Sequence, residues 1–176
     1  MRKIFIKFMV VMSIPFLLME MAVRDFNTFC HSWTTAIKSY LLAKQFNRRA
    51  IYMFFVGLCH DFGKIDLLRT KDGSFVIKSK DKLSDEQFAL IKTHQNSKTA
   101  KWVAILFPEV EYHHEKSNGC GYRGITNLTF EMELIGVADV FSALKMKRNY
   151  KDAMKKEQVK EIMEKMSLNQ NIVKVC

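Results

Sequence analysis

Proline and glycine are scarce in this 176-residue chain, which has two prolines and seven glycines. Sheets need such residues at their tight turns, so the scarcity argues against strand-rich architectures and favours helices. The four cysteines, at positions 30, 59, 120 and 176, show no CxxC spacing. A disulfide framework is therefore not expected, and reduced thiols in a cytoplasmic protein are the simpler interpretation.

Acidic residues are in the minority, with 18 against 28 basic residues and a formal net charge of +10. Such a surplus favours an anionic partner, namely a phosphodiester, a nucleic acid or a membrane surface, although a solvated basic face explains it equally well. Proteins that bind nucleic acid interleave aromatic with basic residues, and the basic run from Lys145 to Lys156 contains only Tyr150. No nucleic-acid partner is therefore expected.

The N-terminal segment is hydrophobic but short of a plain membrane span. Residues 4–19 are almost wholly apolar, interrupted by Lys7 and Pro15, and no small-x-small cleavage pattern follows them. The uncharged run of residues 8–19 is shorter than the about 20 residues that cross a bilayer. We expect residues 1–22 to form a hydrophobic helix packed on the domain or a membrane-proximal stump, with the main domain at residues 23–176. A cytoplasmic location is expected, and membrane association through the N-terminus stays open.

Apolar spacing predicts a mostly helical domain whose length suits one core. Asp72-Gly73 predicts a turn, residues 75–80 suggest a short extended piece, and Ser84 to Gln87 resemble a capping box that opens a helix. The helices expected from periodicity and from Pro108 span residues 34–46, 49–62, 99–107, 130–144 and 157–166.

The residues with the clearest chemical potential lie in GLCHDFGK at positions 57–64, after an apolar run. His60 and Asp61 can reach one metal ion. Gly63 would permit a tight turn, and Lys64 would place an ammonium beside an anion bound there. The pair alone is weak evidence, because His next to Asp is common.

The other histidines and one buried acid strengthen that interpretation. Asp139 lies in an apolar run, where a charge is costly unless it is paired or bound to metal. His113 and His114 are adjacent, so they could serve one site only at a helix end or in an irregular segment. Glu115 could orient a ligand histidine through a hydrogen bond.

This ordering resembles the HD superfamily of metal-dependent phosphohydrolases, and within it the HD-GYP branch. The resemblance covers roughly residues 23–166. The matching segments are RDFNTFCH at 24–31, HDFGK at 60–64, His94, HHEKSNGCGY at 113–122, VADVFSAL at 137–144 and RNYK at 148–151.

The resemblance implies an all-α HD-domain helical bundle around a dinuclear metal site. It implies His31, His60, Asp61 and Asp139 as the ligands of one ion. His94, His113 and His114 would hold the second, with Asp61 bridging. Imidazoles and carboxylates suit divalent Fe or Mn, with Zn as a further candidate.

The family further implies a phosphodiesterase in bacterial second-messenger signalling that hydrolyses cyclic di-GMP to the linear dinucleotide pGpG. Whether a second hydrolysis step continues to GMP stays open. A hydroxide between the metals would attack the phosphorus, so Asp61 and Lys64 are the catalytic candidates. Lys64, Gly121, Tyr122, Arg148 and Lys151 are the candidates for substrate binding. A related cyclic dinucleotide remains open as substrate.

Three departures from the family pattern sustain an alternative, a degenerate HD-GYP domain that binds nucleotide or a protein partner without hydrolysis. Asn27 replaces a frequent Glu, so two metals are expected rather than three. The loop at residues 121–124 reads GYRG, without the family proline and one residue short, which puts its credited protein-partner role in question. His94 and His113 are 19 positions apart, roughly a helical turn closer than usual, which could rotate the histidine pair away from the metals.

Overall fold

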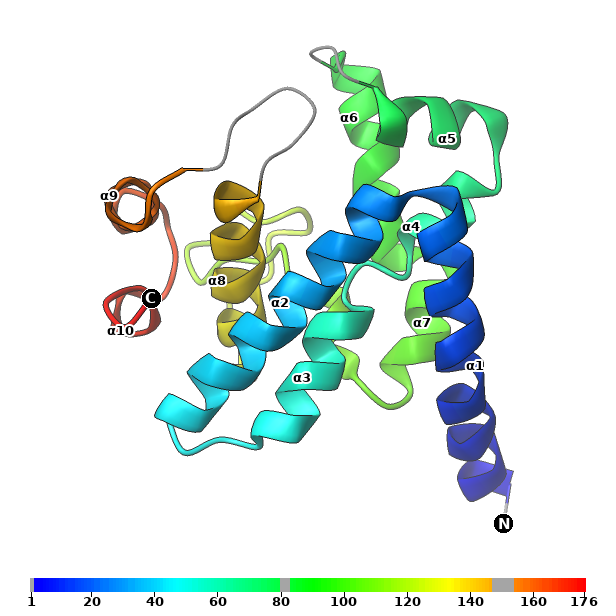
Figure 1. Ribbon diagram of the computed structural model, residues 1–176, viewed down its shortest axis with the longest axis horizontal. Helices are drawn as coiled ribbons and strands as arrows, with labels where there is room; N and C mark the ends of the chain where they lie inside the picture. The colour runs from blue at the N-terminus through cyan, green and yellow to red at the C-terminus, as the bar shows by residue number, and fades with distance from the viewer. Residues whose placement is uncertain (1, 80–82, 147–153) are drawn as a thin grey trace.

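The computed structural model describes residues 2–79, 83–146 and 154–176, which form helices joined by short connections (Figure 1). These ranges contain no strand, so the all-α prediction is confirmed. The elements are α1 (Arg2–Arg24), α2 (Phe26–Gln45), α3 (Ala50–Cys59), α4 (Lys64–Leu68), α5 (Lys71–Lys78), α6 (Asp85–Lys92), η1 (Thr93–Asn96), α7 (Lys98–Ala104), η2 (Pro108–Glu111), α8 (Phe130–Lys145), α9 (Lys156–Glu164) and α10 (Gln170–Val173).

The core is built where α2 packs against α3 and α8. Helix α3 is buried mainly toward its C-terminal end, from Val56 to Cys59, whereas Ile51 and Phe55 are exposed, so its nearly continuous apolar sequence overstates its burial. Gly57 allows α2 and α3 to approach closely, because a Cβ atom there would lie 2.8 Å from the Cα atom of Ala36. The same helix leads directly into His60 and Asp61.

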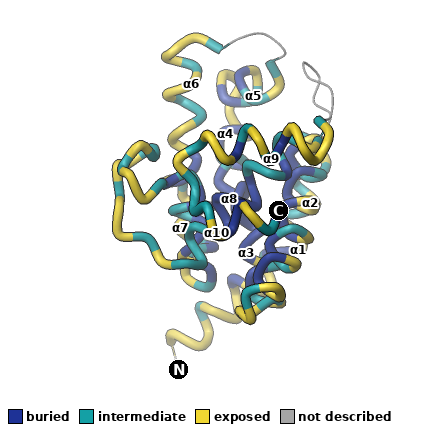
Figure 2. Tube along the Cα trace, turned by 90° about the vertical axis from the view of Figure 1, so that its left-hand side faces the viewer, coloured by how far each residue is buried: buried dark blue, intermediate teal, exposed yellow. Residues whose placement is uncertain are grey.

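Helix α1 packs against the domain through a few of its residues, while its N-terminal end does not. Val10, Ile14 and Met21 are buried, and Arg69 of the segment after α4 contacts Glu20 at 2.7 Å. The N-terminal end of α1 extends away from the other helices and is largely exposed (Figure 2). Helix α1 ends at Arg24, two residues past the expected boundary, and the division into two units remains a prediction.

Within the described ranges, α1 is the one helix long and apolar enough to cross a membrane, as judged by length and composition. The sequence argument considered only the uncharged residues 8–19, whereas the helix continues for 23 residues through Pro15. The length argument against a span therefore does not hold. A helix packed on a domain passes the same test, and α1 does have buried residues.

The segment after α4 differs from the expectation. Asp72 and Gly73 lie in the first turn of α5, and residues 75–78 are helical rather than extended; Lys80 lies outside the described residues. Thr70 explains the difference, because its hydroxyl accepts a hydrogen bond from the Gly73 amide at 3.1 Å and caps the helix. A Cβ atom at Gly73 would lie 2.5 Å from the Leu67 carbonyl oxygen, so this glycine serves close packing.

Helix caps also correct other boundaries. Asp25 accepts hydrogen bonds from the Asn27 amide and the Thr28 hydroxyl, so α2 begins at residue 26 and His31 lies in its second turn rather than at its start. The capping box at Ser84 is confirmed by reciprocal hydrogen bonds with Gln87. Helix α7 ends at Ala104 rather than at residue 107, and α10 follows α9 near the C-terminus.

Replacing Gly57 with alanine should destabilise the domain. The new methyl group would lie within 2.9 Å of the Ala36 Cα atom and the Thr35 carbonyl oxygen. These are backbone atoms in a packed core, so they cannot shift without moving the helix. Overpacking of this kind costs about 1–3 kcal/mol, measurable by denaturant unfolding. Adding Ser39→Ala should recover little, since it removes only one of the three close contacts. An unchanged free energy of unfolding in Gly57→Ala would contradict the packing argument.

Candidate metal centre

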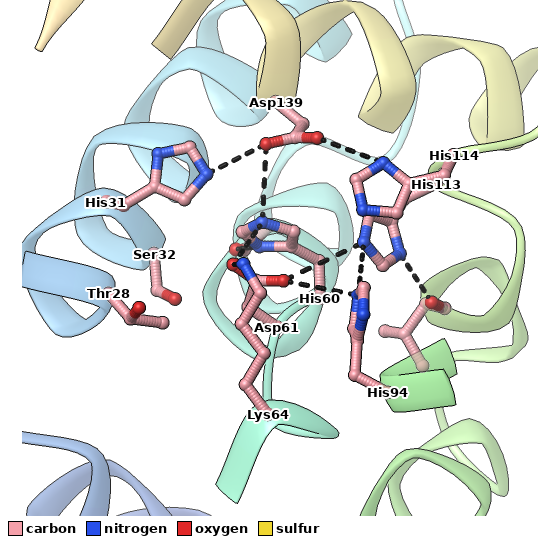
Figure 3. Close-up of polar contacts among 12 residues, drawn as sticks. Thr28, His31, Ser32, His60, Asp61, Lys64, His94, His113, His114 and Asp139 are labelled. Atoms are coloured by element: carbon pink, nitrogen blue, oxygen red, sulfur yellow. Dashed lines mark hydrogen bonds and ion pairs between the residues drawn. The ribbon is translucent and has the colours of Figure 1, made fainter. Parts of the chain in front are cut away.

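The five histidines and two aspartates of the prediction converge on one buried place (Figure 3). Three of the five contributing segments lie at helix ends or turns, and the other two lie within long helices: His60 and Asp61 after α3, His94 in η1, and His113 and His114 after η2, with His31 in α2 and Asp139 in α8. Segments distant in sequence thus supply one site.

The side chains form groups in which possible ligand atoms lie within 4.8 Å of one another. One group is His94, His113 and His114, and another is His31, His60 and Asp61. These are the same two sets that the resemblance assigns to two ions, apart from Asp139. A further group joins His60, His113 and Asp139 across them.

The Asp61 carboxylate lies between the two sets. Its Oδ2 atom is 3.5 Å from Nε2 of His60, while its Oδ1 atom is 3.5 Å from Nε2 of His94 and 3.8 Å from Nε2 of His113. Each oxygen therefore faces a different set, which is the arrangement that a bridging carboxylate needs.

Asp139 makes a second link that the sequence did not reveal. Its Oδ1 atom lies 2.8 Å from Nε2 of His31 and 3.6 Å from Nε2 of His60. Its Oδ2 atom lies 3.6 Å from Nδ1 of His114, in the other set. Sequence reasoning placed Asp139 with one ion only, because a helical position does not tell how far its carboxylate reaches.

Three histidines share one orientation. The Nδ1 atoms of His60, His94 and His113 each lie 2.7 Å from the carbonyl oxygen three residues earlier. A carbonyl only accepts hydrogen bonds, so each Nδ1 carries the proton and each Nε2 presents a lone pair to the centre. Partners of this kind orient metal-binding histidines.

The lone pairs at the centre fit a cation. Nε2 of His94 and Nε2 of His113 are 3.3 Å apart, although neither carries a proton to share. Nε2 of His60 and Oδ1 of Asp61 are buried without a hydrogen-bond partner. Buried polar atoms are normally satisfied, so this donor set fits divalent metal ions. Nitrogen and carboxylate donors suit Fe, Mn or Zn.

Burial and charge set the protonation states. Burial lowers the pKa of His94 to about 4 and that of His114 to about 3, and it holds the pKa of His113 well below its ordinary value. Burial also lowers the pKa of His31, against the effect of Asp139. These imidazoles are neutral at pH 7, which is the state that binds metal.

The two carboxylates stay ionised. Burial would raise the pKa of Asp61, but Lys64 and the neighbouring histidines outweigh it and hold the pKa well below its ordinary value. Burial of Asp139 is outweighed in the same way by His31 and His60. Burial would lower the pKa of His60, but the two aspartates raise it instead. The site therefore combines two ionised carboxylates with four neutral imidazoles, and His60 is the one histidine of the five whose protonated form is favoured.

Lys64 and Gly63 complete the first turn after the ligands. The Lys64 ammonium lies 2.6 Å from Oδ2 of Asp61, with a fifth of its side chain exposed. Gly63 has an ordinary helical φ of −59°, so a special turn is not the reason for glycine, contrary to the expectation. A Cβ atom there would lie 2.0 Å from the His94 carbonyl oxygen. Gly63 thus lets η1 bring His94 to the centre.

Glu115 supports the following loop instead of a histidine, which corrects the expectation for that residue. Its buried carboxylate accepts hydrogen bonds from the amides of Arg123 and Ile125. Gly121 packs against it, because a Cβ atom would lie 2.6 Å from Cα of Glu115. The sequence suggested that this glycine admits substrate, whereas its contacts are with the chain itself.

The predicted substrate residues divide between described and undescribed parts of the chain. The Tyr122 ring lies against His114, with centroids 4.4 Å apart, and burial raises the pKa of Tyr122 to about 12. Arg148 and Lys151 lie outside the described residues, so their roles remain predictions.

The short spacing between His94 and His113 does not separate them. Helix α7 ends early, η2 follows it, and a turn brings His113 and His114 into the centre, as expected for adjacent histidines in an irregular segment. The rotation away from the site that the short spacing left open is absent at these residues. Asn27 is exposed.

Replacing Asp61 with asparagine should release metal. The variant keeps the shape but removes the charge between the two sets, so we expect the metal content to fall from near two ions per chain to below one. Elemental analysis of anaerobically purified protein measures this. Glu161→Gln, at an exposed carboxylate on α9, is the matched control and should keep its metal. Unchanged metal in Asp61→Asn would refute the bridging position.

Acidification should destabilise the metal-free protein. His94 has a folded pKa of about 4 against an ordinary 6.5, so between these values the unfolded chain binds more protons and stability falls as pH falls. At pH 5 the loss is on the order of 2 kcal/mol for this histidine by linkage. Urea unfolding at pH 7.5 and pH 5 tests it, and His94→Gln should reduce the difference. Equal pH dependence of both proteins would contradict it.

Comparison with known proteins identifies the family. The sequence model of the HD domain matches residues 28–175, a range that contains every residue of the two sets and Asp139. The chain is 30% identical over 149 residues to 3'3'-cGAMP-specific phosphodiesterase 1 of Vibrio cholerae serotype O1 (strain ATCC 39315 / El Tor Inaba N16961), covering 77% of this chain and 33% of that protein. It is 27% identical to 3'3'-cGAMP-specific phosphodiesterase 3 of the same strain, covering 76% of this chain and 30% of that protein. The chain thus spans about a third of the length of these curated relatives, and it belongs to the HD domain family.

Proposed function

We propose that this chain is a metal-dependent phosphodiesterase of the HD-GYP branch that hydrolyses cyclic dinucleotides. The observation that carries the proposal is the Asp61 carboxylate, which faces one set of histidines with each oxygen. Such a site suits two ions that share a ligand, which is the arrangement used for in-line displacement at phosphorus.

The substrate proposal is a cyclic dinucleotide that contains guanine. The resemblance to HD-GYP domains favours cyclic di-GMP, opened to pGpG, with GMP as a further product. The names of the two Vibrio relatives add 3'3'-cGAMP as a second substrate. Both molecules carry two phosphodiester bonds and at least one guanine, so one site could accept either.

The bound metals and the histidines that hold them would have separate roles in the proposed hydrolysis. Two divalent ions, Fe or Mn in preference to Zn, would supply an activated water at neutral pH and neutralise charge on the phosphate. His60, His94 and His113 are held ready by their hydrogen bonds to carbonyl oxygens, so little reorganisation is needed on binding.

Lys64 is the proposed electrostatic partner of the phosphate. Its ammonium lies beside Asp61 at the partly exposed edge of the site, within reach of an anion that enters there. We keep Arg148 and Lys151 as the proposed ligands of the other phosphate, and Tyr122 and Gly121 as the residues beside the substrate.

The alternative proposal is a binding module without hydrolysis. The altered GYRG loop favours it, because Arg123 is tied to the Glu111 carbonyl oxygen at 2.7 Å and to Asn96 at 3.2 Å. Arg123 and Gly124 still have exposed surface, so a protein partner could contact the loop.

We propose a cytoplasmic location, with α1 as the element through which the chain could associate with a membrane.

Turnover by metal-loaded protein tests the enzyme proposal. We expect cyclic di-GMP or 3'3'-cGAMP to be converted to linear product, and the double variant His60→Ala, Asp61→Ala to lose both metal binding and hydrolysis.

Lys64→Met should retain metal and lower kcat by about 10²–10³-fold, as expected for the loss of one electrostatic contact. Arg148→Ala should mainly raise KM. Two bound metals without turnover of either substrate would favour the binding module.

A further inference from the structure

An aromatic path leads from the metal centre to the surface at α6. His114, one of the predicted ligands, contacts the ring of Tyr122, and Tyr122 in turn meets the ring of Phe88 edge to face with centroids 6.1 Å apart. The Phe88 side chain is 44% exposed and is not part of the hydrophobic core cluster. Core packing therefore does not explain a large aromatic residue at this position.

A positive charge lies on the same surface. The Lys92 ammonium is 4.7 Å from the centre of the Phe88 ring and 5.3 Å from that of Tyr122. Lys92 is exposed, and it follows Phe88 by one turn of α6. The ammonium thus occupies the place beside both rings where a flat ligand would lie.

This surface is coupled to the centre by chain continuity. Helix α6 leads into η1 without a break, so Phe88 and Lys92 lie on the same continuous helical segment as His94. A ligand that contacts both α6 and the metals would be held by one continuous piece of backbone.

We propose that Phe88 and Lys92 form a base subsite that receives one guanine of the substrate; this inference rests on the proposed function and names its specificity determinant. Phe88 supplies the stacking face, with the Tyr122 ring beside it. Base stacking on an aromatic side chain outweighs an exposed contact between a cation and a ring, so an incoming base displaces the Lys92 ammonium from the ring.

The displaced ammonium then selects the base. Guanine presents two acceptors, O6 and N7, on one edge, and lysine is a common donor to both. Adenine presents an amino group in place of O6, which an ammonium cannot contact favourably. The subsite therefore prefers guanine, and its flexible lysine reaches the edge of a base stacked on Phe88.

Two substitutions separate stacking from edge recognition. Phe88→Leu should raise KM for cyclic di-GMP by about tenfold, with kcat changed by less than threefold, because stacking contributes to binding rather than to the reaction at phosphorus. Lys92→Met should reduce the ratio of kcat/KM for cyclic di-GMP over cyclic di-AMP by about tenfold. Phe75→Leu on α5 and Lys101→Met on α7 are matched exposed controls and should behave as wild type.

A binding measurement distinguishes failure of the subsite from failure of the proposed function. Calorimetric titration of metal-loaded protein with linear pGpG needs no turnover, and Phe88→Leu should weaken it about tenfold while pApA binds wild type less tightly than pGpG. If hydrolysis is absent but this pattern holds, the subsite stands and the enzyme proposal falls. If pGpG does not bind wild type, or binds Phe88→Leu equally well, the subsite is overturned whether or not hydrolysis occurs.

Discussion

The structure depends on the burial of two carboxylates among five imidazoles. Asp61 and Asp139 are almost fully buried, and a buried carboxylate is costly unless cations or strong hydrogen bonds compensate for its lost hydration. The Lys64 ammonium and the histidines beside these carboxylates compensate in part. Oδ1 of Asp61 and Nε2 of His60 have no hydrogen-bond partner, so the compensation is incomplete, and a bound cation would complete it.

The helices serve this constraint through their ends. His60, His94 and His113 each follow the end of a helical turn, and each uses the carbonyl oxygen three residues earlier to fix its ring. Glycine then permits the approach: Gly57 lets α3 lie close against α2, and Gly63 lets η1 lie against the turn after His60. The same local hydrogen bond, repeated at several helix ends, thus orients the ligand histidines without a sheet or a long loop.

Sequence reasoning predicted the residue types of the site and the helical class, because residue identity and apolar spacing are local properties. It could not predict the reach of Asp139 between both sets or the true partner of Glu115, since each depends on tertiary packing. The function of Gly63 was misjudged for the same reason: its neighbour, the His94 carbonyl, is 31 positions away. The helix at α5 was missed because the cap from Thr70 overrode the turn propensity of Asp72-Gly73.

We propose that Asp61 joins two metal ions in one site. Electron paramagnetic resonance of protein reconstituted with Mn²⁺ tests it most directly, because ions that share a carboxylate are magnetically coupled. We expect the spectrum of a coupled pair, and in Asp61→Asn we expect the spectrum of isolated ions or no bound metal. A spectrum of isolated Mn²⁺ in the wild-type protein would contradict it.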